Sequence, residues 1–225
     1  MMAAIEISLL AFGGMRQVSD VRRTSTGADL PIPTTDDTSN TGEIIGENTT
    51  ANEQDVTFGQ LVLEAFKYSS KMVRVSAELM QDSATDMASL LGQQLGERIG
   101  RITNTHFTTG DASSKPNGIV TAAGDSGVTT AANTAFTHSE LLQLVHSVDP
   151  AYRDIGGRFM FNDTTFRIIK EMKDSQNRPL WVPGVAAGAP DTIDAYPYTV
   201  NQDMASGASA KSIIFGALGK YIMIQ

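Results

Sequence analysis

Residues 83–107 form the stretch that most restricts how this chain can fold. Ser83 and Asp86 give the S-x-x-D pattern of a helix start. Apolar residues then recur at helical spacing on one face: Leu91, Leu95, Ile99 and Ile102. A helix of this length spans about 37 Å, well above the mean for globular proteins. We therefore predict a long amphipathic helix to which other parts of the chain attach.

A second stripe beside the apolar one consists of glycines four residues apart: Gly92, Gly96 and Gly100. Three glycines cost a helix roughly 3 kcal/mol relative to alanine, so we expect another backbone or a bulky side chain to pass close by. The G-x-x-x-G spacing also occurs in membrane helix pairs. However, Glu97, Arg98 and Arg101 interrupt the segment, and no run of about 18 apolar residues exists in the chain. The pattern therefore favours a helix lying on a sheet within a soluble domain.

The composition predicts a globular chain without cysteine chemistry. With 225 residues and 41% hydrophobic content, the chain can bury a core in one or two domains. The absence of cysteine excludes disulfides, thiolate metal sites and a cysteine nucleophile. The N-terminus has no basic region before its short apolar run, so it is a poor secretory signal.

The net charge of -8 comes from one segment. Between Arg23 and Lys67 there is no lysine or arginine, and eight acids lie in that interval: Asp29, Asp36, Asp37, Glu43, Glu47, Glu53, Asp55 and Glu64. These eight equal the net charge, so the rest of the chain is close to neutral. Segregated charge of this kind concerns partners and association more than fold.

The acidic segment reads as a long hairpin. We expect residues 5–24 to be an arm with an extended end, followed by an edge strand containing Pro31 and Pro33. Residues 34–55 are polar and predict a disordered loop. A long return strand is then indicated by apolar residues of one parity: Val56, Phe58, Val62, Phe66 and Tyr68. An isolated two-stranded ribbon is marginal in water, so this hairpin needs a surface to lie on.

The part after the long helix predicts turns and short strands up to about residue 134, and then an α/β pattern. Residues 138–148 read as a helix capped by Thr137 with Glu140. Residues 158–161 read as a buried strand, and residues 163–173 as a helix with Phe166, Ile169 and Met172 facing inward. Residues 192–200 follow a loop, and residues 211–218 and 220–225 read as two closing strands.

The search for chemistry predicts no catalytic, cofactor or metal site. The three histidines, His106, His138 and His146, have no metal-ligand spacing and are expected on the surface or in the core. The pair Asp36 and Asp37 lies in the loop, where catalytic geometry could not be held. An α/β hydrolase-like enzyme would need a nucleophile, a base and an orienting group, and the sequence supplies none. Four arginines could receive acidic partners or phosphate, or could form ordinary solvated pairs: Arg22, Arg23, Arg98 and Arg101.

Several stretches in their order resemble the major capsid protein of tailed bacteriophages, the Hong Kong 97-type fold. Residues 73–91 resemble the passage into the family's spine helix, and residues 106–119 resemble its phenylalanine-glycine turn and P-x-G-I segment, with Phe107, Gly110, Pro116, Gly118 and Ile119. Residues 158–181 are similar to a strand, helix and lysine-aspartate loop of its A-domain. The last strands are similar in residues 195–204 and 213–224. The resemblance covers nearly the whole chain.

The resemblance implies an α+β Hong Kong 97-like fold in four parts. These are an N-terminal arm (residues 1–20), an E-loop hairpin (21–82), a P-domain spine helix with following strands (83–133) and an A-domain (134–225). Relative to the family, the chain looks short at its C-terminus, or its sequence is incomplete, and no scaffolding segment is visible ahead of the arm. The hairpin has no lysine between Arg23 and Lys67, which argues against the covalent cross-link that some members make there.

The function that the resemblance implies is structural: a protein that self-assembles, as hexamers and pentamers, into an icosahedral bacteriophage head enclosing double-stranded DNA. An encapsulin-like nanocompartment shell is the alternative. The implied partners are other copies of the chain, portal, scaffold or decoration proteins, and packaged DNA without sequence-specific contact, with no membrane and no cofactor. The implied location is the virion capsid, assembled in the host cytoplasm.

The residues and the resemblance together predict how subunits meet. We expect the acidic hairpin to reach onto an adjacent subunit and the A-domains to cluster about the symmetry axes, with many weak contacts adding up in a closed shell. The predicted subunit-contact residues are the loop acids, the four arginines and the helix glycines: Asp36, Asp37, Glu43, Glu47, Glu53, Asp55, Arg22, Arg23, Arg98, Arg101, Gly92, Gly96 and Gly100.

Overall fold

The computed structural model describes residues 14–24, 27–76, 78, 87–130, 136–174, 176–178, 180, 192–207 and 211–224. The chain divides into two compact units. We call residues 1–21 and 66–223 the body, and residues 22–65 with 224–225 the hairpin unit. The expected arm before Gly14 and the expected helix start at Ser83 lie outside the described residues. The four-part division of the chain stays a prediction.

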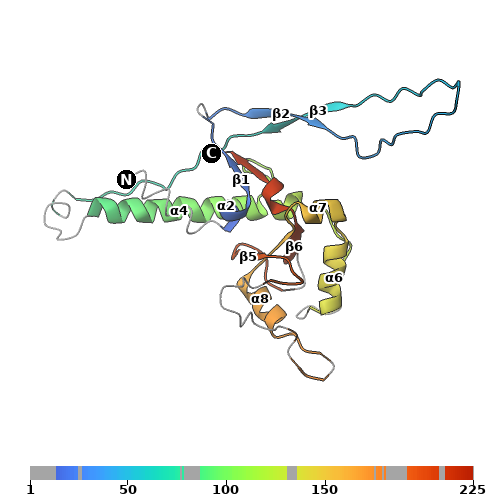
Figure 1. Ribbon diagram of the computed structural model, residues 1–225. Helices are drawn as coiled ribbons and strands as arrows, with labels where there is room; N and C mark the ends of the chain where they lie inside the picture. Colours follow the sequence, from blue (N-terminus) through green and yellow to red (C-terminus); the bar gives the residue numbers. More distant parts are fainter. Residues whose placement is uncertain are drawn as a thin grey trace. The chain divides into compact units, whose positions relative to one another are not determined.

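The hairpin unit contains strands β2 (Leu30–Thr35) and β3 (Phe58–Leu63), joined by a long loop (Figure 1). The strands pair antiparallel, from Leu30 opposite Leu63 to Thr35 opposite Phe58. The edge strand predicted around Pro31 and Pro33 is confirmed. The long return strand predicted over residues 56–68 is wrong in length, because β2 offers pairing partners over six residues only.

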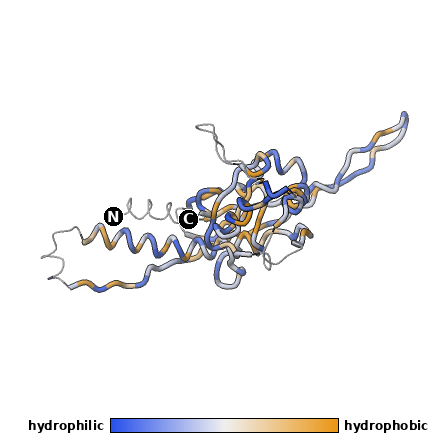
Figure 2. The backbone as a smooth tube through the Cα atoms, turned by 90° about the horizontal axis from the view of Figure 1, so that it is seen from below, coloured by the Kyte–Doolittle hydropathy of each residue, from blue (hydrophilic) through white to orange (hydrophobic). Residues whose placement is uncertain are grey.

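The predicted long helix is confirmed as α4 (Met87–Thr109), 23 residues long, in which hydrophilic and hydrophobic positions alternate (Figure 2). Its buried residues are mainly small or polar, with one aromatic residue and no aliphatic one: Gly92, Gly96, Gly100, Thr103, Asn104, Phe107 and Thr108. The aliphatic stripe is only half-buried, and the Ile102 side chain is 39% exposed. The expectation that α4 lies on a sheet is also wrong, since it packs mainly on two short helices, α2 (Gly14–Val18) and α5 (Ile119–Ala122).

These two short helices correct two further predictions. Residues 14–18 form helix α2, where an extended segment was expected, and residues 119–122 form α5, where turns and strands were expected. Contacts distant in sequence hold α2: the side chain of Met15 is fully buried and its N–H donates to Asn104 Oδ1 at 3.0 Å. After α2 the chain becomes extended as predicted, in β1 (Asp20–Arg22), which pairs with β7 (Ile222–Ile224).

The rest of the body consists of a three-stranded sheet and short helices. Its central strand β4 (Arg158–Phe161) runs parallel to β5 (Tyr198–Val200) and antiparallel to β6 (Ile213–Gly216). The predicted helices are present as α6 (His138–His146) and α8 (Asp163–Lys170), and the Thr137–Glu140 capping box is confirmed. The short helix α7 (Pro150–Asp154) had no sequence prediction. The two closing strands predicted over residues 211–218 and 220–225 are present but shorter, as β6 and β7, because η1 (Leu218–Lys220) lies between them.

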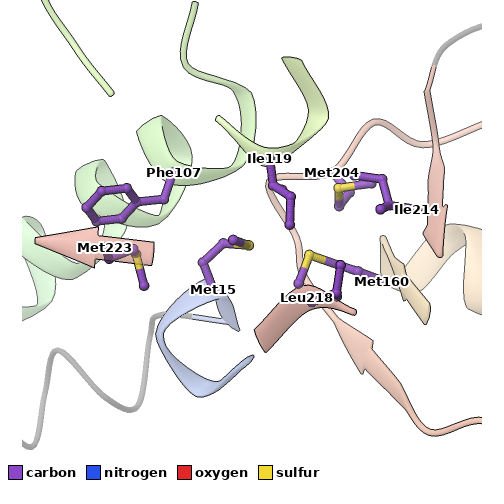
Figure 3. Packing of buried hydrophobic residues seen from close by; sticks show 8 residues of the cluster. All are labelled: Met15, Phe107, Ile119, Met160, Met204, Ile214, Leu218 and Met223. Atoms are coloured by element: carbon purple, nitrogen blue, oxygen red, sulfur yellow. The ribbon is translucent and has the colours of Figure 1, made fainter. Parts of the chain in front are cut away.

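The sheet is buried on both faces because side chains alternate along β4. Phe159 and Phe161 point into a cluster with α6 and α8, and Phe159 lies 4.7 Å from Phe215, centroid to centroid. Met160 points the other way, into a second cluster (Figure 3). Residues from α2, α4, α5, β4, β6, η1 and β7 meet there: Met15, Phe107, Ile119, Met160, Met204, Ile214, Leu218 and Met223. Through Phe107, this second cluster connects the C-terminal end of α4 to the sheet.

Candidate assembly surfaces

The acidic loop of the hairpin unit, residues 36–57, contains all six predicted contact acids, and all six are exposed. Some of these carboxylates also hold the loop together. Asp36 accepts from the backbone and the hydroxyl of Thr38, at 3.1 and 2.7 Å. Glu43 bridges to the other arm of the loop by accepting from the backbone and side-chain nitrogens of Asn52, at 2.7 and 2.6 Å. The loop predicted as disordered therefore has specific internal contacts.

These hydrogen bonds also favour the ionised forms of Asp36 and Glu43. The hydroxyl and backbone N–H of Thr38 lower the pKa of Asp36 below its ordinary value. The backbone and side chain of Asn52 do the same for the pKa of Glu43. Glu47, Glu53 and Asp55 are exposed carboxylates along the same loop. At neutral pH the loop is a concentrated negative surface.

The hairpin unit also exposes large apolar side chains that the sequence analysis did not select as contact residues. Ile44 in the loop is fully exposed, and the side chain of Phe58 at the start of β3 is 80% exposed. Leu61 and Val62 are about half exposed, at 52% and 49%. The sequence analysis had already placed Phe58 and Val62 on one face of the predicted strand. Their exposure could have been expected from that pattern, because a two-stranded ribbon cannot bury both of its faces by itself.

The four predicted arginines are exposed and fall in both units. Arg22 and Arg23 belong to the hairpin unit, and Arg98 and Arg101 lie on α4 in the body. Arg101 Nη2 lies 3.3 Å from Glu97 Oε2 one helical turn away. Such a surface pair stabilises a protein by about 0–1 kcal/mol.

The three helix glycines are buried within the chain itself. Their burial agrees with the close approach that the sequence predicted. Their role in contacts between subunits stays a prediction, as do the roles of the acids and arginines.

A buried polar junction, missed by the sequence analysis, joins α4 to the end of β5. Asn104 Nδ2 donates to Asn201 Oδ1 at 2.9 Å and also contacts Asp203 Oδ2. Asn201 Nδ2 in turn donates to Thr108 Oγ1 at 2.9 Å. No local pattern could have revealed this junction, since its members are more than 90 positions apart in the chain.

The described residues offer little that is suited to catalysis. His138 and His146 are exposed, and the half-buried His106 has its Nδ1 3.0 Å from the Tyr68 hydroxyl. No group of three potential metal ligands occurs within the described ranges. A cavity of about 730 Å³ lies between α5, α6 and β6, with a mainly apolar lining that includes Phe136, Leu141 and Ile214. None of the helices in the described part of the chain is long and apolar enough to cross a membrane.

Comparison with solved structures identifies the fold. The chain superposes on "Capsid of native GTA particle computed with C5 symmetry" with a TM-score of 0.81 and 24% identity, covering 92% of this chain and 74% of that one. A structure from Mycobacterium phage Bobi matches with a TM-score of 0.69 and 11% identity, covering 92% and 69%. One from Mycobacterium phage Adephagia gives 0.68 and 13%, covering 92% and 68%. Comparison with curated proteins gave no match.

The fold is therefore the α+β capsid fold of the Hong Kong 97 type, as the sequence predicted. A family model described as the phage capsid family matches residues 2–225. The chain belongs to the phage capsid family and is a structural major capsid protein of the virion. Neither the family match nor these structures supports the encapsulin alternative.

Proposed function

We propose that this capsid protein closes into an icosahedral shell of hexamers and pentamers around packaged DNA, and that its hairpin unit reaches onto an adjacent subunit. The observation behind this proposal is the exposure of Phe58 at 80% on a ribbon that has little core of its own. Burying a phenylalanine side chain contributes about 1.5–3 kcal/mol, which a neighbouring subunit can supply. Assembly takes place in the host cytoplasm, with portal, scaffold or decoration proteins as further partners.

The acidic loop adds an electrostatic part to this contact. Its exposed carboxylates face no lysine or arginine within the loop, so a basic or neutral surface of another subunit suits it. The exposed Arg98 and Arg101 on α4 are the proposed cationic partners, which would donate to the loop carboxylates. Exposed charge pairs are screened by salt, so shell stability should fall as ionic strength rises. Packaged DNA is expected to make no sequence-specific contact.

The test is to shorten the hairpin without breaking its strands. Replacing residues 37–56 by Asn-Gly lets Asp36 and Thr57, one position beyond the Thr35–Phe58 pair, form the hydrogen-bonded pair that flanks a two-residue turn. We expect this variant to remain folded by circular dichroism but to form few or unstable shells in electron micrographs. A control variant keeps the loop and changes Glu47 and Glu53 to Gln, which should assemble with a weaker salt dependence. Shells of normal yield and stability from the shortened hairpin would contradict the proposal.

A further inference from the structure

The two edges of the β2–β3 ribbon differ in their backbone donors. Proline has no N–H, and Pro31 and Pro33 lie opposite Val62 and Gln60 in the register. Bonded and unbonded pairs alternate in an antiparallel ladder, so these two proline pairs must be unbonded ones. The ladder bonds therefore fall on the alternate pairs: Leu30 with Leu63, Ile32 with Leu61, and Thr34 with Gly59.

One edge of the ribbon is consequently blocked and the other is open. The outer edge of β2 has proline at two of its outward positions, a common way to prevent strand addition. The outer edge of β3 presents the N–H and C=O groups of Phe58, Gln60 and Val62. Within the described residues, these strands form a sheet of two only, and no further backbone bond uses those N–H groups.

The open edge is chemically complementary to itself. Residues 58–63 are FGQLVL and contain no charged residue. If two copies of β3 run antiparallel and are centred on Gln60, Phe58 of each lies opposite Val62 of the other. Aromatic and β-branched side chains form favourable cross-strand pairs, and Gln60 can hydrogen-bond with its own counterpart. Both Phe58 and Val62 are exposed in the single chain, at 80% and 49%.

We propose that β3 is a pairing edge through which two copies of this capsid protein join about a two-fold axis. The product is a four-stranded antiparallel sheet in the order β2–β3–β3–β2. The proposal rests on the proposed function, in which the hairpin unit contacts another subunit, and names the part of the hairpin that makes the contact. A two-fold contact uses the same surface on both copies, as a self-complementary edge requires.

Charge also favours a second copy in this antiparallel arrangement. The acidic loop follows β2 and precedes β3, so it lies at one end of the ribbon. Antiparallel pairing of two β3 strands places the two loops at opposite ends of the joint sheet, where their like charges are well separated. Parallel pairing would place the two acidic loops side by side, which like-charge repulsion disfavours.

The first test uses the absence of native cysteine. In the proposed sheet, Gln60 faces Gln60 of the second copy with Cα atoms about 5.5 Å apart, within the range of a disulfide. Mild oxidation of Gln60→Cys shells should give disulfide dimers on non-reducing gels. Thr35→Cys, on the blocked edge, is the matched control and should stay monomeric. Normally assembled Gln60→Cys shells with no dimer, or with no more than the control, would overturn the proposal.

The second test removes only an outward N–H. Gln60→Pro leaves the β2–β3 ladder intact, because residue 60 donates no bond to β2, but it removes both N–H donors of the central pair between copies. Pairing should weaken on the order of tenfold or more relative to Gln60→Ala, measured as dissociation of shells in dilute denaturant. Leu61→Pro, which removes an inward donor, shows the effect of breaking the hairpin itself.

The outcomes of these tests separate the two proposals. If the shortened loop prevents assembly while Gln60→Pro and Gln60→Ala shells are equally stable, the hairpin reaches a neighbour but not through β3. If the shortened loop and Gln60→Pro both leave the shells unchanged, both proposals are wrong. Cross-linking of Gln60→Cys to a second cysteine placed elsewhere on the chain, but not to itself, would show that another segment of the second copy occupies the edge.

Discussion

Asn104 on α4 and Asn201 after β5 are 97 positions apart in the chain, yet their side chains share a hydrogen bond of 2.9 Å. Asn104 Oδ1 also accepts the N–H of Met15, and Asn201 Nδ2 donates to Thr108 Oγ1. Two buried amides thus join α2, α4 and the edge of the sheet. Buried polar networks of this kind favour one arrangement of their elements, because a partly satisfied network costs more than an apolar contact.

Replacing Asn104 with alanine should destabilise the body by about 2–4 kcal/mol. The change leaves the Met15 N–H without its acceptor and removes one of the two N–H donors to Asn201 Oδ1. Denaturant unfolding of the subunit measures the effect. Gln94→Ala, an exposed position on the same helix, is the matched control and should stay within about 0.5 kcal/mol of the parent. Equal stabilities of the two variants would show that the junction contributes nothing.

The three buried glycines of α4 give a prediction in which two effects oppose each other. Changing Gly92, Gly96 and Gly100 to alanine should raise intrinsic helix stability by roughly 3 kcal/mol in total. We expect a net loss of stability and of shell yield instead, because all three positions are buried and added methyl groups must displace their neighbours. Thermal melting and electron microscopy measure the two quantities. A triple variant that melts higher and assembles normally would count against close packing on this face.

Gly110 and Gly118 make a backbone contact that excludes side chains. A Cβ at Gly110 would overlap the carbonyl oxygens of Pro116 and His106, and a Cβ at Gly118 would lie 2.7 Å from the backbone of Thr108. We expect Gly110→Ala to destabilise the body by several kcal/mol or to prevent folding, as overpacking against backbone does. Gly124→Ala has open space around it and should be nearly neutral. Soluble yield and thermal melting compare the two variants.

The bonds from Asn52 to Glu43 predict a pH dependence of the loop. The pKa of Glu43 is lowered in the folded chain from its ordinary value of 4.5, so the bonds stabilise the loop fully above that pH. Their contribution should disappear as the pH falls through the lowered folded value. Amide chemical shifts of Asn52, followed by NMR, report this transition. In the Glu43→Gln variant this transition of the Asn52 shifts should be absent, because glutamine does not titrate. A transition that persists unchanged in the variant would belong to another titrating group.

Much of the local structure follows from neighbouring residues. The Thr137–Glu140 cap, the short apolar run of β4 and the 3.6-residue period of α4 are all short-range patterns, and the structure contains each of them. The lack of lysine and arginine between Arg23 and Lys67 could likewise be read directly, because charge is a property of composition. The order of the motifs was enough to predict the capsid fold.

Long-range contacts decided the rest. Amphipathicity predicted that α4 would bury its leucines and isoleucines, but the line of glycine, threonine and asparagine residues is the buried one, and Asn104 on that line contacts α2 through Met15. Helix α2 is too short to form by propensity and depends on Met15 and Asn104. The amino-acid sequence by itself therefore indicated the two longest helices of the α/β part, the long helix α4, the acidic hairpin and the edge strand with its two prolines. The tertiary structure decided which helix face is covered and which strand edge is left open, since both depend on residues that meet only after folding.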